Sequence, residues 1–120
     1  MLNLDTNILL HALIDDLTRE ERKILRKNPW CASAIVLWEI SKLKAKRRIS
    51  LDLDSVEFSQ FFNQINILPL TLAICRTSTE LDFSSDPADE LIAATSVVHR
   101  VPLLTRDRKI RGSKLVPLAL

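Results

Sequence analysis

The sequence MLNLDTN (residues 1–7) opens the chain with a short, mostly apolar run that ends abruptly in Asp5, Thr6 and Asn7. Such a run is typical of a short buried strand, although it is too brief for hydrophobic periodicity alone to decide. Residues 6–16 then place apolar side chains at helical spacing, which predicts a helix directly after the strand. Asp5 therefore lies at a strand–helix junction, where a carboxylate can serve a binding site or cap the helix.

The rest of the chain continues this alternation of apolar strands and amphipathic helices. Ser33 and Thr71 are expected N-caps, and Asp86 followed by Pro87 is a strong helix-start signal. Helices are expected at residues 17–27, 34–48, 56–64, 71–81 and 86–100, and strands at residues 29–33, 65–70, 101–105 and 114–120. The expected buried face of the helix at residues 34–48 contains Ile35, Val36, Trp38, Ile40 and Leu43. This order predicts one α/β domain over residues 1–120, with helices on both faces of a parallel sheet.

Composition excludes several classes of protein. The formal net charge is only +2, which argues against a basic coat for nucleic acid, although residues 42–48 and 105–114 are basic and residues 81–90 are acidic. Such runs are usually solvated helix faces and become informative only if they meet around one cleft. Gly112 is the only glycine, whereas a Rossmann fingerprint or a P-loop needs several, so no nucleotide cofactor is expected.

The sequence has the features expected of a cytoplasmic protein. No apolar run approaches the roughly 20 residues that span a bilayer, and no secretory signal is visible, so no membrane association is expected. Cys31 and Cys75 lie in apolar contexts without a CxxC pair. They are predicted to be buried free thiols rather than zinc ligands, which suits a reducing compartment.

Four acidic residues are expected to meet at one edge of the predicted sheet. Ligands of open α/β sheets bind outside the carboxyl ends of the strands, where the strand order reverses. Asp5 ends the first strand and Asp107 follows the strand at residues 101–105, so both carboxylates enter one crevice if these strands are neighbours. Glu39 and Asp89, each on a predicted helix, are expected to border the same edge.

Each of these acids alone has an ordinary structural explanation. Asp5 is a good helix N-cap, and Glu39 suits the solvated side of its helix. Asp89 is placed to complete a capping box with Asp86, and Asp107 suits a turn. No single acid is specific evidence for a site, so the hypothesis rests on their combination.

Carboxylates gathered in this way repel one another. At about 4 Å and an effective dielectric near 20, one like-charged pair costs on the order of 4 kcal/mol. The acidic motifs contain no lysine to offset this repulsion. A hard divalent cation would do so, and Mg²⁺ typically binds one or two carboxylates while keeping waters and substrate phosphates. Acids, metal and basic segments together favour cleavage of an RNA or DNA backbone.

The four segments that carry the acids together resemble the PIN-domain ribonucleases, and more narrowly the toxins of VapC-type toxin–antitoxin pairs. They are LDTNILL (residues 4–10), SAIVLWEI (33–40), DPADELIAATS (86–96) and VPLLTRD (101–107). The resemblance implies a PIN-like domain with a five-stranded parallel sheet of order 3-2-1-4-5, which places the first and fourth strands side by side. It also implies a metal-dependent ribonuclease that acts on RNA, forms a homodimer and is silenced by a small antitoxin protein.

The resemblance further assigns residues to the site. It implies that Asp5, Glu39, Asp89 and Asp107 form a catalytic Mg²⁺ or Mn²⁺ site, and that Thr6, Asn7 and Thr105 orient the carboxylates or metal-bound water. Asp86 is either an additional acid of the site or only the helix N-cap. In the family, water activated by the metal attacks an RNA phosphodiester, with no covalent enzyme intermediate.

Two departures from the family pattern and two rival functions remain at this stage. Family members often carry Arg where this chain has Glu90, and often carry Gly before the Arg that follows the helix of the second acid, where this chain has the run Lys46-Arg47-Arg48. One rival is a PIN-like module that binds RNA without cutting it. The other, a Mg²⁺-binding phospho-receiver domain, needs an Asp at the end of the third strand, and residues 65–70 offer none.

Overall fold

The computed structural model describes all 120 residues, and its strands and helices alternate as the sequence predicts. The elements are β1 (Leu2–Leu4), α1 (Thr6–Leu13), α2 (Arg19–Lys27), β2 (Trp30–Ser33), α3 (Ile35–Ala45), α4 (Val56–Asn63), β3 (Ile65–Leu68), α5 (Leu72–Ser78), α6 (Pro87–His99), β4 (Leu103–Leu104) and α7 (Arg108–Arg111). No helix has both the length and the apolar character required to cross a membrane.

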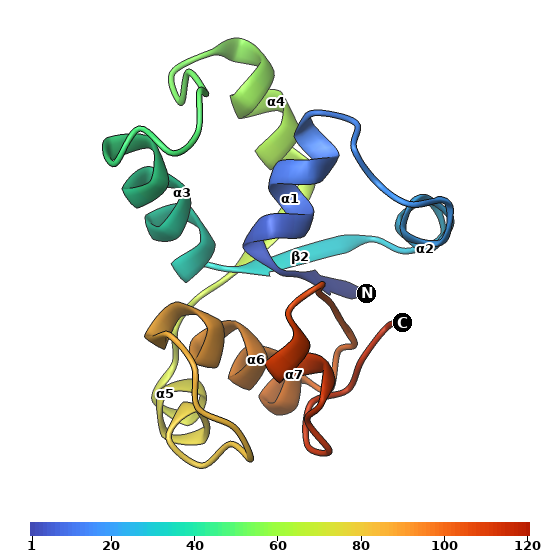
Figure 1. The fold of residues 1–120 in the computed structure, drawn as a ribbon, viewed down its shortest axis with the longest axis vertical. Coiled ribbons are helices and arrows are strands. Elements are labelled where there is room, and N and C mark those ends of the chain that lie inside the picture. The colour runs from blue at the N-terminus through green and yellow to red at the C-terminus, as the bar shows by residue number, and fades with distance from the viewer.

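The strands form one parallel sheet in the order β3-β2-β1-β4. Crossovers between parallel strands are right-handed, so the steps from β1 to β2 to β3 place their helices on one face and the return to β4 crosses the other. Figure 1 shows this arrangement, with α1, α3 and α4 on one side of the sheet and α5, α6 and α7 on the other. The predicted neighbour relation between β1 and β4 is confirmed, so their carboxyl ends share one edge.

The prediction of five strands is wrong, because residues 114–120 do not form a strand. They contribute only an isolated parallel bridge between Leu103 and Leu118. Two backbone hydrogen bonds flank it, from Leu103 N to the Pro117 carbonyl at 2.8 Å and from Ala119 N to the Leu103 carbonyl at 3.0 Å. Pro117 has no N–H to extend the ladder, and β4 itself is only two residues long. The sheet therefore has four strands.

Three further predictions about caps and burial are wrong. Ser33 ends β2 and Ala34 occupies the N-cap position of α3 without a side-chain cap bond, although Ser33 Oγ accepts the Ile35 N–H at 3.3 Å. Trp38 is 53% exposed, because Val36 and Ile40 form the buried stripe of α3 and Trp38 lies about 200° from Val36 around the helix. Cys31 is buried as predicted, but Cys75 is exposed; both thiols are free. By contrast, Thr71 caps α5 as predicted.

The core occupies both faces of the sheet around β1. Leu2 and Leu4 are buried in it, while Asn3 between them is also fully buried. Because side chains alternate along a strand, Asn3 faces the opposite side from the two leucines. Its amide nitrogen donates to the Ile92 carbonyl at 3.2 Å and to Ser96 Oγ at 2.8 Å. These bonds fasten α6 to β1 and thereby fix where the first turn of α6 lies.

An ion pair between Arg106 and the buried Glu21 carboxylate fastens the segment after β4 to α2. Arg106 donates from Nε to Glu21 Oε2 at 2.9 Å and from its terminal nitrogen to Glu21 Oε1 at 2.7 Å. Glu21 also completes a capping box with Thr18 at the start of α2. The Arg106 hydrogen bonds lower the pKa of Glu21 to about 2. This pair holds the chain in place directly between Thr105 and Asp107.

We expect Arg106→Ala to lower the free energy of unfolding by about 1.5–3 kcal/mol, the usual range for a hydrogen bond to a charged group. Urea unfolding at pH 7 measures this loss. The lowered pKa of Glu21 means that the pair stabilises the fold fully above about pH 4.5, and that this stabilisation is lost as the pH falls towards 2. The difference between wild type and variant should therefore shrink in acid.

The exposed pair of Arg22 and Asp15, 3.6 Å apart, supplies the matched control. Exposed ion pairs contribute about 0–1 kcal/mol, so Arg22→Ala should change stability little. Equal losses of stability for Arg106→Ala and Arg22→Ala would show that the pair of Arg106 and Glu21 stabilises the fold no more than an exposed pair does.

Candidate active site

Asp5 lies buried at the carboxyl end of β1, with only 4% of its surface exposed. It is the N-cap of α1, and its Oδ1 accepts the Thr6 backbone N–H at 2.8 Å. Its Oδ2 accepts the Thr105 hydroxyl at 2.6 Å. The two explanations offered by the sequence, helix cap and site residue, are therefore compatible, because one carboxylate oxygen caps α1 while the other faces the chain after β4.

Two threonine hydroxyls link the acids to one another. Thr105 Oγ1 donates to Asp5 and accepts the Asp107 backbone N–H at 3.0 Å. Thr6 Oγ1 donates to Glu39 Oε1, while the Thr6 N–H donates to Asp5. Asp5 thus has a hydroxyl-bearing neighbour on each side, and each hydroxyl reaches another part of the site. The supporting positions predicted for Thr6 and Thr105 agree with this geometry.

Asp89 and Asp107 are each held by one further hydrogen bond. Asp89 Oδ2 accepts the Ser85 hydroxyl at 2.9 Å. Asp107 caps α7, a short helix that the sequence did not predict, and its Oδ1 accepts the Ile110 N–H at 3.0 Å. The capping box expected between Asp89 and Asp86 does not form, because Asp89 reaches one residue further back, to Ser85.

The carboxylates form one electrostatic network. The pKa of Asp5 is raised to about 6, mainly because the carboxylate is buried; the charges of Asp89 and Glu39 also raise this pKa, and the Thr105 and Thr6 hydrogen bonds oppose the shift. Burial is also the main cause of the raised pKa of Glu39 and of Asp89. The charge of Asp89 acts on Glu39, and that of Asp107 acts on Asp89. All four acids predicted from the sequence are therefore coupled, directly or through Asp89.

Two other predicted residues lie at the margin of this network. Asp86 occupies the N-cap position of α6 as predicted, but its side chain makes no cap bond. Its charge nevertheless raises the pKa of both Glu39 and Asp89. Asn7 is exposed, and its side chain makes no hydrogen bond to any acid. An orienting role for Asn7 therefore remains a prediction without a contact in the structure.

The local charge balance at α6 differs from the family pattern in a way that the structure explains. Glu90 Oε2 accepts the Ser85 N–H at 3.3 Å, so this acid stabilises the start of α6. The charge of Lys109 on α7 partly opposes the increase in the pKa of Asp89. A positive charge thus reaches Asp89 from a distant part of the chain instead of from the next residue.

The acids offer a divalent cation only oxygen ligands. As the side chains lie, no three acidic, histidine or cysteine groups are close enough together to hold one ion. Mg²⁺ does not require such a cluster, since it commonly binds through one or two carboxylates and retains several waters. The raised pKa values record the unfavourable energy of these charges in the metal-free protein, which a cation would relieve. The donor set therefore fits Mg²⁺ or Mn²⁺ in its chemistry.

The acid network coincides with a known family pattern. The sequence pattern of the PIN domain matches residues 3–112. The chain belongs to the PIN-domain family. All four coupled acids lie within the matched region, so the network belongs to the PIN domain itself.

Individual relatives of this PIN domain agree with the assignment. Ribonuclease VapC22 of Mycobacterium tuberculosis is 31% identical over 85 residues, which cover 68% of this chain and 65% of that protein, just under two thirds of its length. A toxin–antitoxin complex from Klebsiella pneumoniae contains a chain with 23% identity and a TM-score of 0.67, covering 93% of this chain and 92% of that one. VapBC2 of Rickettsia felis, bound to a promoter DNA fragment, gives 22% identity and a TM-score of 0.70, covering 98% and 97%. The last two similarities establish the fold.

Sequence reasoning missed two residues that position the site. Ser85 holds Asp89, and Arg106 fixes the segment that carries Thr105 and Asp107. Ser85 lies four residues before Asp89 and is not the N-cap of α6, so the capping-box pattern does not indicate it. The partner of Arg106 lies 85 residues away in sequence, and no local pattern indicates it.

The raised pKa of Asp5 predicts a pH dependence of stability. An acid whose pKa is higher in the folded protein than in the unfolded chain favours folding at low pH, and that stability is lost as the pH rises from about 4 to about 6. In EDTA at pH 7.5, Asp5→Asn should therefore be more stable than wild type by roughly 2–3 kcal/mol, and near pH 4 the two should converge. Urea unfolding across this pH range gives the measurement, with exposed Asp54→Asn as control. Parallel curves for wild type and Asp5→Asn would contradict the coupling.

The absence of a cap hydrogen bond from the Asp86 side chain leads to a second prediction. Asp86→Ala should change the free energy of unfolding by no more than about 0.5 kcal/mol, as for an ordinary surface position. Thr18→Ala, which removes an observed cap hydrogen bond at α2, should cost about 0.5–2 kcal/mol. Thermal and urea unfolding in EDTA compare the two. A loss at Asp86 as large as that at Thr18 would restore the capping role.

Proposed function

We propose that this chain is a metal-dependent ribonuclease that hydrolyses RNA phosphodiester bonds, and that it acts as the toxin of a toxin–antitoxin pair. The observation that carries this proposal is the buried Asp5 carboxylate, whose pKa is raised by burial and by the charges of Asp89 and Glu39. An uncompensated group of this kind suits a divalent cation. Membership of the PIN family and similarity to Ribonuclease VapC22 support the same activity.

In this proposal Asp5, Glu39, Asp89 and Asp107 hold Mg²⁺ or Mn²⁺. When bound, such an ion lowers the pKa of a coordinated water and stabilises the negative charge that develops on a phosphodiester. Thr105 and Thr6 keep the Asp5 carboxylate in one orientation through the hydrogen bonds described above. Ser85 does the same for Asp89. Burial of Asp5 excludes water from one side of the site, which strengthens its attraction for a cation.

The proposal includes protein partners. The structural relatives from Klebsiella pneumoniae and Rickettsia felis come from toxin–antitoxin complexes, which supports a small antitoxin as the inhibitor of this chain. An arginine from such a partner suits the acid network, because the planar guanidinium can meet a carboxylate through two hydrogen bonds. A homodimer and a cytoplasmic location complete the proposal and follow from the family resemblance.

The rival function that remains is RNA binding without cleavage. A non-catalytic module has no need of coupled, partly buried acids, since these repel the RNA backbone unless a cation is present. The acid network therefore favours the enzyme. A phospho-receiver is disfavoured, because the PIN pattern covers residues 3–112 and β3 ends in Leu68 without an acid.

Purified protein, free of any antitoxin, should cleave single-stranded RNA in Mg²⁺ or Mn²⁺ and stop when EDTA is added. Asp5→Asn should fold normally and lose cleavage by at least about 100-fold, because it removes a charge that interacts with the ion. Gel analysis of a labelled RNA measures the rate. Asp54→Asn, which changes an exposed acid outside the network, should leave that rate unchanged. Cleavage that survives chelation, or that Asp5→Asn retains in full, would refute the assignment.

A further inference from the structure

A groove of about 520 Å³ lies beside the acid network, between α3 and the start of α6. Glu39 and Asp86 line its acidic side. Lys42, Lys46 and Arg48 line its basic side, together with Trp38. Because Glu39 belongs both to this groove and to the acid network, the groove opens directly onto the candidate active site.

Trp38 is unusual in this groove because a large aromatic side chain is left 53% exposed. The other tryptophan, Trp30, is partly buried, and its indole N–H donates to the Leu25 carbonyl at 2.8 Å. Trp38 makes no such bond. A cation lies over its aromatic ring instead, with Lys42 Nζ 5.5 Å from the ring centroid. The two residues are one helical turn apart on α3, so they present a ring and a positive charge together.

Arg48 is brought to the groove by the way α3 ends. The Arg48 N–H donates to the Leu43 carbonyl at 2.9 Å, and the Arg47 N–H donates to the Lys44 carbonyl at 3.0 Å. This is a Schellman motif, and it places Arg47 in the left-handed region at φ 57°. A glycine would suit that backbone better, yet the turn directs the chain so that Arg48 lines the groove while Arg47 does not.

We propose that this groove binds single-stranded RNA next to the phosphate that is cleaved. Trp38 stacks on one base, and Lys42, Lys46 and Arg48 bind the adjacent phosphates. Stacking on an exposed aromatic ring and contacts between cations and the backbone are the two interactions by which proteins hold single-stranded nucleic acid. The inference rests on the proposed ribonuclease function and adds the residues that hold its substrate.

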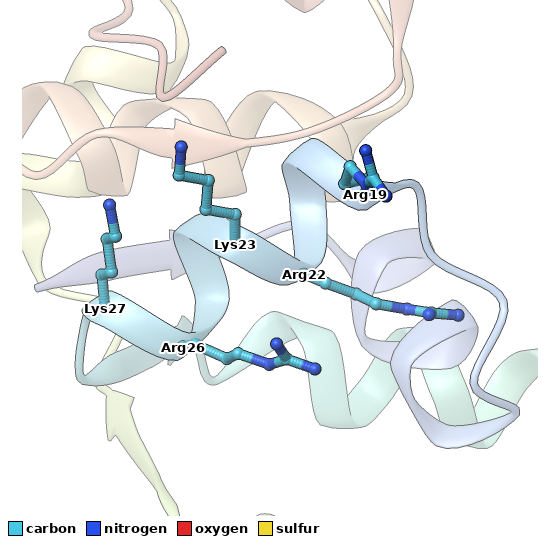
Figure 2. Close-up of a pocket in the computed structure, with 5 residues that line it drawn as sticks. All are labelled: Arg19, Arg22, Lys23, Arg26 and Lys27. Carbon is cyan, nitrogen blue, oxygen red and sulfur yellow. The ribbon is translucent and has the colours of Figure 1, made fainter.

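The basic face of α2 is another concentration of positive charge, and it lacks these features. Five cations line it with no aromatic side chain: Arg19, Arg22, Lys23, Arg26 and Lys27. Figure 2 shows that Lys23 and Lys27 point to one side of the helix and Arg22 and Arg26 to another, so the charges do not converge on one point. Figure 1 places α2 on the far side of α1 from α3. This face serves as a control for nonspecific attraction.

Binding can be separated from cleavage by using Asp5→Asn protein, which is expected to be inactive, in Mg²⁺ with a fluorescently labelled RNA of about ten nucleotides. Loss of one stacked base corresponds to about a 5- to 150-fold weaker Kd, so Trp38→Ala should fall in that range and Trp38→Phe should retain most of the affinity. Lys42→Ala and Lys46→Ala should each weaken binding and reduce its dependence on salt. Lys44→Ala on the same helix, and Lys23→Ala on α2, should change the Kd less than twofold.

Intrinsic fluorescence gives an independent readout. RNA should quench the emission of the protein, and the quench should disappear in Trp38→Phe, which keeps an aromatic ring at this position. Equal Kd values for Trp38→Ala and Lys44→Ala, or a quench that persists without Trp38, would overturn the groove proposal. The groove proposal would also be overturned if the groove variants lost affinity for the antitoxin but not for RNA. These outcomes leave the ribonuclease assignment intact, whereas Trp38-dependent binding by a protein that never cleaves RNA would refute the enzyme and keep the groove.

Discussion

Burial of the Asp5 carboxylate at the end of β1 is the constraint on which the rest of the structure depends. A buried charge is unfavourable unless hydrogen bonds or opposite charges compensate it, and here the Thr6 N–H and the Thr105 hydroxyl supply the only direct compensation. Both donors reach Asp5 only if α1 begins directly after β1 and β4 pairs with β1. The same two contacts therefore tie together a helix start, a strand pairing and the geometry of the site.

The elements that carry the other acids are held by polar contacts between distant parts of the chain. Asn3 in β1 fastens α6, which brings Asp89 to the carboxyl end of the sheet. Arg106 fastens the segment after β4 to α2 and so fixes Asp107. The Asn3 Oδ1 atom is nevertheless left without a hydrogen-bond partner, and Asp5, Glu39 and Asp89 have raised pKa values. The fold thus contains a region of unfavourable electrostatic energy where the acids lie close together, which is usual for a functional site.

The sequence predicted the features that depend on local pattern and failed where distant residues decide. Asp5 and Thr105 were recognisable because polar residues follow apolar strands, and the parallel topology then brings strand ends together. The last strand was wrongly predicted, because its apolar run suggests a strand while Pro117 within it lacks an N–H for the ladder. Four residues are too few for helix periodicity, so α7 was missed, and with it the capping of Asp107. Trp38 was assigned to the core because of its apolarity, although its angle around α3 points it away from the buried stripe.

The placement of charge along α3 is compatible with the proposed RNA substrate, although the protein is nearly neutral. Glu39 lies within the acid network, whereas Lys42 and Lys46 follow at one and two helical turns, about 4.5 and 10.5 Å along the axis. Neither lysine forms an ion pair with Glu39, and the charges that act on the pKa of Glu39 are those of Asp89 and Asp86, so these cations do not neutralise the acid. In the function proposed above, the acids bind a divalent ion while the lysines bind phosphate oxygens, so the two sets of charges serve different ligands. The small net charge of +2 is therefore the sum of an acidic surface and a basic surface, which adjoin at Glu39.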